Sequence, residues 1–555
     1  MGKEDANGHD VVPAPSSPGV GDELMIRLEP IPAWRLAVIL ACIGMGLLLS
    51  VMDTTIVATM LYSISNEFGS LTLLPWVVVS YTLSYAGCAV LIARLADALG
   101  RKPVILGSFA LFLGASIGCT ASKNMSQLIG FRAMQGAGGA GLYSMTMIVY
   151  PEICPPALVP MISSLLGLIV AVAGVCGPII GGLFTTYTTW RWAFGLNGPC
   201  TFIPALVLLF AWPRNFQTYT KLPFSSVDYL GLGLLLAGTV LLVFIVNQVS
   251  IRVYTWDSAP TVAVLVLAGL SWVALVWWER LASRHPRLRH LRSPFPYRIL
   301  TNRVMMCTIF CTVCTGFVMM LTIINLPLRA EFVNLYTAVK SGVLLLPLMG
   351  SMAVGSGLGG AASAKRNNTW WTQIVSAILM LVGSALLSTL TDTTSPEPKQ
   401  YGFQVILGLG VGLSLSTTTF ITSLSVEFED HAVGQGLIAQ MRVFGGSLGV
   451  ASSFIVLNTM IQDRLKNVLT PEELSDFYTS PIATYSFPLP QQLKVREVYI
   501  DSFNVNMRVC IGISALAVIA ALCTYQRRPP TIKKRLDELA EVYARSATTA
   551  AATDA

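Results

Sequence analysis

Long apolar stretches follow one another from Trp34 to Tyr525, with short polar segments between them. Stretches of roughly 17–25 apolar residues are long enough to cross the ~30 Å hydrocarbon core of a bilayer as helices. Backbone groups in lipid must be satisfied within their segment, and these stretches are too long and too uniformly apolar for barrel strands. We predict an all-α integral membrane protein with about fourteen spans, near 35–62, 75–96, 103–121, 127–150, 160–186, 192–212, 229–249, 260–281, 303–325, 338–363, 370–390, 401–424, 432–460 and 505–525.

Composition supports the same interpretation. Hydrophobic residues make up 54% of the chain and charged residues 12%, whereas charged residues are roughly 25% of an ordinary soluble protein. The eleven cysteines lie within or beside apolar stretches, as small hydrophobic side chains do, and the four histidines lie in tails or loops. Cys307, Cys311 and Cys314 lie at helical spacing on one face of a predicted span, where a metal site is the alternative, but no histidine is near them. Because acid, histidine and cysteine ligands do not otherwise cluster, we expect no enzyme activity, no metal and no cofactor. The net charge of +7 does not indicate a nucleic-acid partner.

Basic residues mark one side of the predicted membrane domain. If the amino-terminal tail is cytoplasmic, the inside segments are the basic ones at nearly every turn, which is the bias that orients membrane proteins. The inside set is Arg94, Arg101, Lys102, Arg214, Lys221, Arg280, Arg284, Arg287, Arg289, Arg292, Arg298, Arg303, Lys365, Arg366, Arg527, Arg528, Lys533, Lys534 and Arg535. We therefore predict an even number of spans, with both termini in the cytoplasm.

The chain divides into two six-helix halves with two extra spans between them. The predicted segments are a disordered cytoplasmic tail at 1–33, a first half at 34–214, the extra spans and a basic cytoplasmic loop at 215–302, a second half at 303–526 with a long outside loop at 461–503, and a cytoplasmic tail at 527–555. A repeat relates the halves, because the glycine-spaced run 139–146 is echoed at 410–417. Such symmetry is typical of transporters that rock one half against the other. By the same offset, the counterpart of Arg132 is Phe403.

Two charged residues lie inside predicted spans of the first half. Asp53 is in the first span, about nine residues from its outer end, and Arg132 is in the fourth; at ~1.5 Å per residue both lie in the outer half of the bilayer. A charge at a span centre costs roughly 2.5–3.5 kcal/mol, so each needs a partner or a wet cavity. We interpret Asp53 and Arg132 as a proton-coupling pair. A purely structural ion pair, and an arginine that extends to the headgroups, are the alternatives.

Other polar residues at membrane depth are candidates for substrate contact or pairing. Arg442 either binds an anionic group of a substrate, pairs with an acid of another span, or lies near the cytoplasmic side. Gln135, Asn247 and Gln440 either line a cavity or form hydrogen bonds between helices, which is the commoner use of buried amides.

The loop between the second and third spans carries Asp97, Gly100, Arg101 and Lys102. Glycine permits a tight turn, the basic residues hold the loop in the cytoplasm, and Asp97 can pair with them. A topological anchor explains these charges equally well. It does not explain the order of residue types along the whole loop.

That order resembles the loop pattern of the major facilitator superfamily, and further motifs resemble its fourteen-span drug:proton antiporters. These are the first-span acid Asp53 with Thr55, the fourth-span R-x-x-Q-G-x-G from Arg132 to Gly138, and the antiporter pattern G-P-x-x-G-G at Gly177, Pro178, Gly181 and Gly182. Ala93 and Ala98 depart from the loop pattern, which leaves the detail of gating there open. The resemblance implies a gating loop, an antiport span and proton-coupled export of amphipathic or hydrophobic small molecules by alternating access.

Within that family the chain resembles fungal efflux pumps for toxins, drugs and other secondary metabolites. Proton-coupled uptake of a siderophore or another small molecule by the same fold is the alternative. The expected energy source is the proton gradient, and the expected partners are a small-molecule substrate, protons and the lipid bilayer. We expect a monomer in the plasma membrane, with the vacuolar membrane as the alternative.

Overall fold

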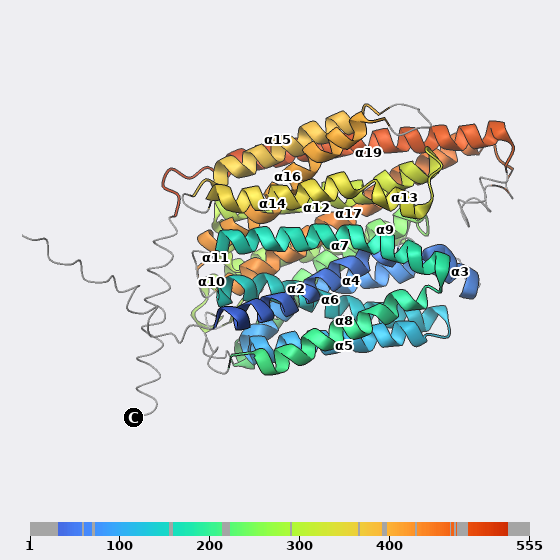
Figure 1. Ribbon diagram of the computed structural model, residues 1–555. Helices are drawn as coiled ribbons and strands as arrows, with labels where there is room; N and C mark the ends of the chain where they lie inside the picture. Colours follow the sequence, from blue (N-terminus) through green and yellow to red (C-terminus); the bar gives the residue numbers. More distant parts are fainter. Residues whose placement is uncertain are drawn as a thin grey trace, which may run out of the picture.

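The computed structural model describes residues 32–57, 60–68, 73–154, 159–213, 223–288, 291–363, 367–390, 397–427, 430–466, 468–470, 473 and 487–530. Over these residues the chain is a bundle of long helices that run side by side (Figure 1). The predicted tails at 1–33 and 527–555 lie almost entirely outside the described residues. The expectation of an all-α membrane domain is confirmed for the described part of the chain.

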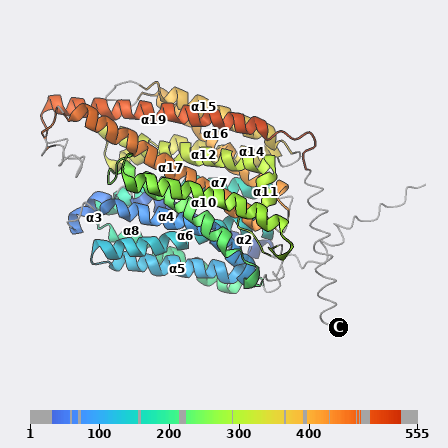
Figure 2. The same ribbon diagram turned by 180° about the vertical axis from the view of Figure 1, so that it is seen from behind.

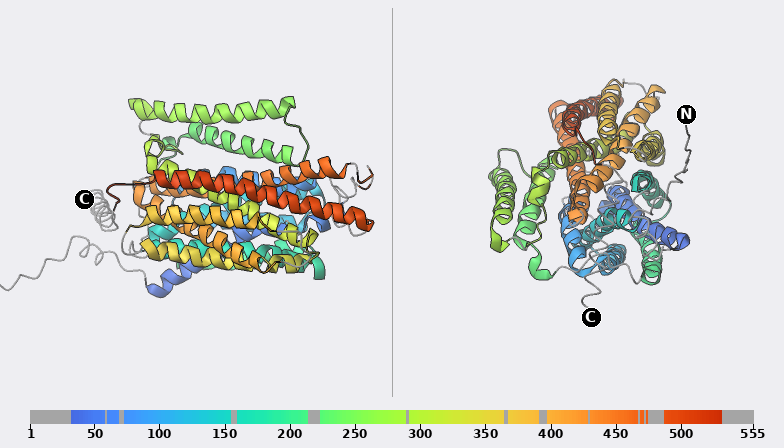
Figure 3. Two further views of the ribbon diagram at one scale, coloured as in Figure 1. Left: turned by 90° about the horizontal axis from the view of Figure 1, so that it is seen from above. Right: turned by 90° about the vertical axis from the view of Figure 1, so that its left-hand side faces the viewer.

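The helices form two groups and a peripheral pair (Figure 3). The first group is α2 (Ala33–Ile56), α3 (Leu61–Phe68), α4 (Leu74–Leu99), α5 (Arg101–Ala121), α6 (Met125–Ile153), α7 (Val159–Tyr187) and α8 (Arg191–Ala211). The second is α11 (Tyr297–Thr301), α12 (Arg303–Phe332), α13 (Ala338–Val343), α14 (Leu346–Ser363), α15 (Thr369–Leu387), α16 (Lys399–Ser425), α17 (His431–Leu465) and α19 (Leu489–Cys523). Between them in sequence lie α9 (Tyr229–Ser250) and α10 (Ala259–Arg284), with short 3₁₀ turns at Phe224–Ser226 and Pro286–Leu288.

Polar side chains at the helix starts satisfy backbone groups that have no partner within the helix. The Asn124 side chain accepts a hydrogen bond from the Gln127 amide at the start of α6, and Asp228 accepts one from the Gly231 amide at the start of α9. Asn302 does the same for α12. Such caps mark where a helix begins, whereas the apolar sequence that follows makes the helix favourable in lipid.

Thirteen of the described helices are long and apolar enough to cross a membrane. The 29-residue helix α6 is not among them, because glycines, Arg132 and Gln135 lower its hydropathy; yet it packs between α4 and α5. Together with α6, this set is compatible with the fourteen predicted spans. Helices α9 and α10 lie to one side of the bundle, and only 17% of the most apolar part of α10 is buried (Figures 2 and 3). The apolar surface of α10 therefore faces lipid.

The predicted first span is wrong at its outer end. We expected one helix over 35–62, but α2 ends at Ile56 and a separate short helix, α3, begins at Leu61. The hydroxyls of Thr54 and Thr55 donate to the carbonyl oxygens of Val51 and Met52, at 2.6 and 3.0 Å. Such local bonds and β-branched side chains weaken the helix here. Asp53 consequently lies within the last turn of α2.

Two further boundaries also differ from the predictions. The predicted span 338–363 agrees with one membrane-length segment at Val339–Ser363, but a turn divides it into α13 and α14, where Pro347, the second residue of α14, cannot continue the preceding helix. The predicted outside loop 461–503 is largely helical in its described part, since α17 continues to Leu465 and α19 begins at Leu489. Polar residues there alternate at helical spacing with buried ones such as Val495 and Tyr499, and the Tyr499 ring stacks on Phe332 at 4.2 Å.

Glycine contacts reveal the register of the internal repeat. In α6, a Cβ added to Gly136 would meet the backbone of Tyr81 in α4, and one at Gly138 would meet Phe112 in α5. In α16, Gly408 faces the backbone of α14 and Gly410 faces α15 in the same way. The equivalent positions are therefore 136 with 408 and 138 with 410. By this register the counterpart of Arg132 is the fully buried Gln404 and not Phe403. The pairing of 139–146 with 410–417 predicted from the sequence is therefore wrong by one residue.

The two halves meet along two seams. Helix α7 packs against α14 and α13, and α4 packs against α17. In the first seam, the Ser356 hydroxyl donates to the carbonyl oxygen of Ser164 at 3.0 Å. In the second, Gly436 of α17 lies against Ala93 of α4. The functional residues lie on the helices that form these seams or just behind them.

Candidate functional site

Asp53 and Arg132 meet in the interior of the first half. The side chain of Asp53 is 0% exposed and that of Arg132 is 1% exposed, and Arg132 Nη1 forms an ion pair with Asp53 Oδ2. We predicted from their positions along the spans that the two residues lie at comparable depth in the bundle, and the ion pair confirms this. The alternative in which Arg132 extends to the headgroups is wrong, because the guanidinium points into the protein. A buried charge pair of this kind persists only when its remaining donors and acceptors are also satisfied.

Neutral amides complete the surroundings of the pair. Gln135 donates from Nε2 to Asp53 Oδ1 at 3.1 Å and accepts from Arg132 Nη1 at 2.8 Å. Asn197 of α8 donates from Nδ2 to the same Oδ1 at 3.0 Å. Gln135 also donates to Ser116 of α5 at 2.9 Å. The carboxylate thus faces one cation and two amides from two helices, α6 and α8, a cluster that we call the Asp53 network.

Aromatic rings and a backbone carbonyl cover the other side of the guanidinium. Arg132 Nε donates to the carbonyl oxygen of Val77 at 3.1 Å. The Arg132 Cζ atom lies 4.2 Å from the centroid of the Tyr81 ring and 5.6 Å from that of Phe194. A cation over an aromatic face is stabilised by the ring quadrupole, most strongly when water is excluded. The Asp53 network is therefore closed on both sides in this conformation.

A column of hydroxyl groups extends from this network toward the second half. The Tyr81 hydroxyl donates to the carbonyl oxygen of Ser50 at 2.9 Å, and Ser50 Oγ lies 3.1 Å from the Tyr85 hydroxyl. The Tyr85 ring packs on that of Tyr143 with centroids 6.0 Å apart. Tyr143 in turn contacts the second half of the molecule, where Arg442 lies.

Arg442 is the second arginine at membrane depth among the candidates, and it is 5% exposed. Its Nη1 donates to the Tyr143 hydroxyl at 2.8 Å and its Nη2 donates to Thr418 Oγ1 at 3.1 Å. Within the described residues, no acid forms an ion pair with it. Of the three alternatives, pairing with an acid is wrong for this conformation. At ~1.5 Å per residue, Arg442 lies about 16 Å along α17 from its first residue, His431, and so not near the end of the helix that we predict to be cytoplasmic.

The other predicted amides do not join these clusters. Gln440 donates weakly to Thr239 of α9 at 3.4 Å, and Asn247 donates to the carbonyl oxygen of Val243 in its own helix at 2.8 Å. The Gln440 contact agrees with hydrogen bonding between helices as the commoner use of buried amides, whereas the Asn247 bond lies within α9. Of the candidate amides, only Gln135 contacts the Asp53 network.

The charged loop between α4 and α5 bonds to two other helices of the first half. Gly100 adopts φ of 98°, which only glycine takes readily and which allows α5 to start directly after α4. Arg101 donates to Asp97 at 2.7 Å and forms two bonds, of 3.0 and 2.9 Å, to Glu152 at the end of α6. Lys102 donates to the carbonyl oxygen of Leu209 at 2.9 Å. The loop is thus fixed to α6 and α8.

Arg94, on the last turns of α4, connects this loop to the rest of the protein. It bonds to Asp97 at 3.2 Å, lies 3.8 Å from Asp430 before α17, and donates to the carbonyl oxygen of Ser293. Burial raises the pKa of Asp430 despite the opposing effect of Arg94. Because Asp430 belongs to the second half and Ser293 to the linker after α10, Arg94 closes this end of the bundle.

The predicted antiporter motif lies on α7, in the first seam between the halves. Pro178 lies inside the continuous helix, and an added Cβ at Gly177 would collide with Thr55 of α2. On the other side, Gly342 of α13 lies against Pro178 and Ile179. Gly181 and Gly182 are buried, and their carbonyl oxygens accept hydrogen bonds from Thr185 and Thr186. The motif thus allows α7 to lie close to α2 of the first half and to α13 of the second. Its contact with α2 is at Thr55, two residues after Asp53.

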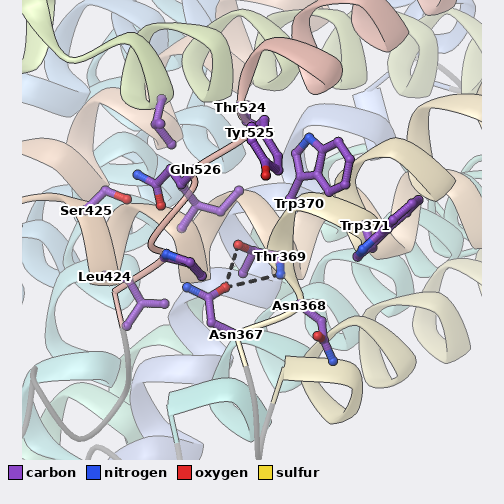
Figure 4. A pocket seen from close by; sticks show the side chains of 13 residues that line it. Asn367, Asn368, Thr369, Trp370, Trp371, Leu424, Ser425, Thr524, Tyr525 and Gln526 are labelled. Carbon is purple, nitrogen blue, oxygen red and sulfur yellow. Dashed lines mark hydrogen bonds between the residues drawn. The ribbon is translucent and has the colours of Figure 1, made fainter.

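A cavity of 240 Å³ lies elsewhere, at the end of the second half where α19 finishes (Figure 4). Amide, hydroxyl and aromatic side chains line it, among them Asn367, Thr369, Trp370 and Tyr525. It contains none of the predicted site residues. It is distinct from the buried charge clusters.

Two groups of helices around buried charges, closed at one end by a charged loop, are typical of a helical membrane transporter. The family model described as Major Facilitator Superfamily matches residues 43–450, and the chain belongs to this superfamily. It is therefore a secondary transporter that works by alternating access.

Similar proteins support this assignment. The chain is 33% identical over 507 residues to the MFS-type transporter FPY5 of Fusarium mangiferae, covering 89% of this chain and 84% of that one. It is 30% identical over 441 residues to the rubrofusarin-specific efflux pump aurT of Gibberella zeae, covering 78% of each. The human organic anion transporter MFSD10 has the same fold, with a TM-score of 0.55 at 11% identity over 86% of this chain and 99% of that one.

Proposed function

We propose that this protein exports amphipathic or hydrophobic small molecules in exchange for protons, without enzymatic activity or a cofactor. The observation that carries this proposal is the Asp53 network, in which one carboxylate is buried against one guanidinium and otherwise against neutral groups. If a proton neutralises Asp53, Arg132 loses its counterion and the network must rearrange. Such a change of partners can bias the two access states, as alternating access requires.

The position of the network links protonation to movement between the halves. Asp53 lies in the last turn of α2, next to Thr55, which contacts Gly177 on α7. A rearrangement around Asp53 therefore reaches the seam formed by α7, α13 and α14. Relatives named as efflux pumps, such as the rubrofusarin-specific pump, support export as the direction.

Topology follows from the same arrangement. Helix α2 begins and α19 ends at one end of the bundle (Figure 1), and that end carries Arg94, Arg101 and Lys102. The bias of basic residues toward the cytoplasm supports cytoplasmic termini. We place the protein in the plasma membrane as a monomer, with its charged loop facing the cytosol.

Dye transport in proteoliposomes tests the proposal. Full-length protein is reconstituted with known orientation, a pH gradient is imposed, and movement of rhodamine 6G is followed by fluorescence. We expect the dye to move out of the cytoplasmic compartment against its gradient while protons move inward. Asp53→Asn should abolish dependence on the pH gradient, whereas Asn247→Gln, on a helix away from the network, should preserve it.

Two results would contradict this proposal. If correctly inserted Asp53→Asn protein still shows transport driven by the pH gradient, the coupling assignment is wrong. If the wild type instead carries a ferric hydroxamate siderophore into the cytoplasmic compartment and leaves the dye, the direction is uptake.

A further inference from the structure

Arg442 is a buried cation without a counterion. Its contacts are the hydroxyls of Tyr143 and Thr418, and the described residues place no carboxylate within 4.0 Å of it. The buried arginines Arg132 and Arg94, in contrast, each pair with an acid. Holding an uncompensated charge away from water is costly. At Arg442, which is 5% exposed and lies where the two halves meet, the protein maintains that cost.

The guanidinium has unused donors. An arginine carries five N–H groups, and Nε of Arg442 has no hydrogen-bond partner. Buried polar groups are normally satisfied, so a buried guanidinium with an unused donor and no carboxylate within reach indicates a place for a ligand.

The contact between Arg442 and Tyr143 joins the two halves. Tyr143 belongs to α6 of the first half, whereas Arg442 and Thr418 belong to α17 and α16 of the second. The Tyr143 ring packs on that of Tyr85, so the hydroxyl that accepts from Arg442 belongs to a pair of packed aromatic side chains. A phenol hydroxyl is a neutral acceptor, which a negatively charged oxygen can replace with a stronger, charge-assisted bond.

We propose that Arg442 is the cargo-binding residue and that it takes a singly charged anionic oxygen group, a carboxylate or an ionised phenol or enol, on an aromatic molecule. One guanidinium surrounded by neutral hydroxyls neutralises a single negative charge, whereas a dianionic phosphate would leave an uncompensated charge in a low dielectric. The cargo oxygen replaces the Tyr143 hydroxyl, so binding breaks a bond between the halves. This inference rests on the proposed function and names its substrate class.

The test uses two fluorescent probes of nearly identical shape, anthracene-2-carboxylate and anthracene-2-carboxamide, which differ by one charge. Binding to detergent-solubilised full-length protein is measured by titration. The wild type should prefer the carboxylate, and Arg442→Gln should lower that preference about tenfold, equivalent to ~1.4 kcal/mol. Arg442→Lys should retain an intermediate preference. Arg329→Gln, at another buried arginine of the second half, is the matched control and should leave the preference as in the wild type.

Tyr143→Phe tests the displacement step. It removes the competing hydroxyl, so we expect carboxylate affinity to rise about two- to threefold. A fall in carboxylate affinity in this variant would mean that the cargo oxygen does not replace the Tyr143 hydroxyl. The absence of a carboxylate preference in the wild type, or its persistence in Arg442→Gln, overturns the assignment of Arg442. Monodisperse elution of each variant shows that the fold is intact.

The dye assay described for export keeps the two proposals separate. A wild type that prefers the carboxylate but shows no proton-driven dye movement contradicts the proposed function alone. A wild type that moves the dye with the pH gradient but does not discriminate between the probes overturns the anion assignment alone.

Discussion

Arg132 and Arg442 are the same residue type at similar burial in opposite halves, but their surroundings differ. Arg132 faces Asp53, with Gln135 completing the bonds, whereas Arg442 faces hydroxyls only. Removing either partner of the first pair leaves a buried charge alone, while removing Arg442 takes such a charge away. Burial and residue type therefore do not distinguish the roles of these two arginines. The presence or absence of a counterion does.

The largest expected effect comes from breaking the compensated site. Asp53→Asn or Arg132→Gln should each lower the free energy of unfolding by about 3–5 kcal/mol, since each leaves one buried charge unpaired. The double variant should recover most of that loss, because both charges are gone. Denaturant unfolding in detergent measures these values. Additive losses in the double variant would contradict the description of the pair as mutually compensating.

A smaller effect should follow from displacing the helix that carries Arg132. An added methyl group at Gly136 would collide with the backbone of Tyr81, so Gly136→Ala should cost about 1–3 kcal/mol through overpacking. Gly130 lies in the same helix with nothing within 4 Å of an added Cβ. Gly130→Ala should therefore be neutral or raise stability, by up to ~1 kcal/mol, because alanine favours helix. Thermal unfolding of both variants checks this, and equal losses would be inconsistent with the close contact.

An exposed pair shows what solvent does to the same chemistry. Glu67 of α3 bonds to Arg191 at 2.6 Å, which holds the pKa of that carboxyl below its usual value, aided by Trp190. The stabilisation is present above the ordinary pKa and is lost as the outside pH falls through the lower folded value. Because Glu67 is 44% exposed, we expect at most ~1 kcal/mol, removed by Glu67→Gln.

Hydrogen exchange of the α3 amides measures that pH effect. Protection should decrease on acidification in the wild type and should no longer respond to pH in Glu67→Gln. An unchanged pH response in the variant would assign the effect to another group.

The smallest expected change in stability is at the uncompensated site. Arg442→Gln removes a desolvated charge together with two hydrogen bonds to neutral hydroxyls, and we expect stability within ~1 kcal/mol of the wild type. The contrast with Arg132→Gln, measured in the same unfolding experiment, tests the comparison directly. A loss as large as that of Arg132→Gln would mean that Arg442 has an essential structural partner.

The sequence predicts much of the network because charges in apolar stretches are few. Asp53, Arg132 and Gln135 follow from depth and spacing, but Asn197 was not among the candidate site residues. Its signal is a buried amide two residues before Pro199 in α8, yet the direction in which a span residue faces depends on helix packing. The same limit applies to Glu152, the partner of Arg101 from 51 residues away.

The predictions of helix boundaries and of the repeat register were wrong for related reasons. The glycine pattern of α6 matches α16 in two registers one residue apart, and only the backbone contacts of Gly136 and Gly408 distinguish them. The segment 489–503 is polar enough to be read as a loop, although it forms the start of α19 through packing of Val495 and Tyr499. Tertiary contacts decide such cases, and hydropathy does not detect them.

The end of α17 and the start of α19 together form a helical extension that a binding protein could recognise. It reaches beyond the other helices at one end of the bundle (Figure 1), and the stack of Phe332 on Tyr499 anchors it firmly. An antibody fragment raised against this extension would mark one face of the protein. It would sort vesicles by the orientation of the transporter within them, and it would give electron microscopists a landmark on a particle otherwise hidden in its micelle.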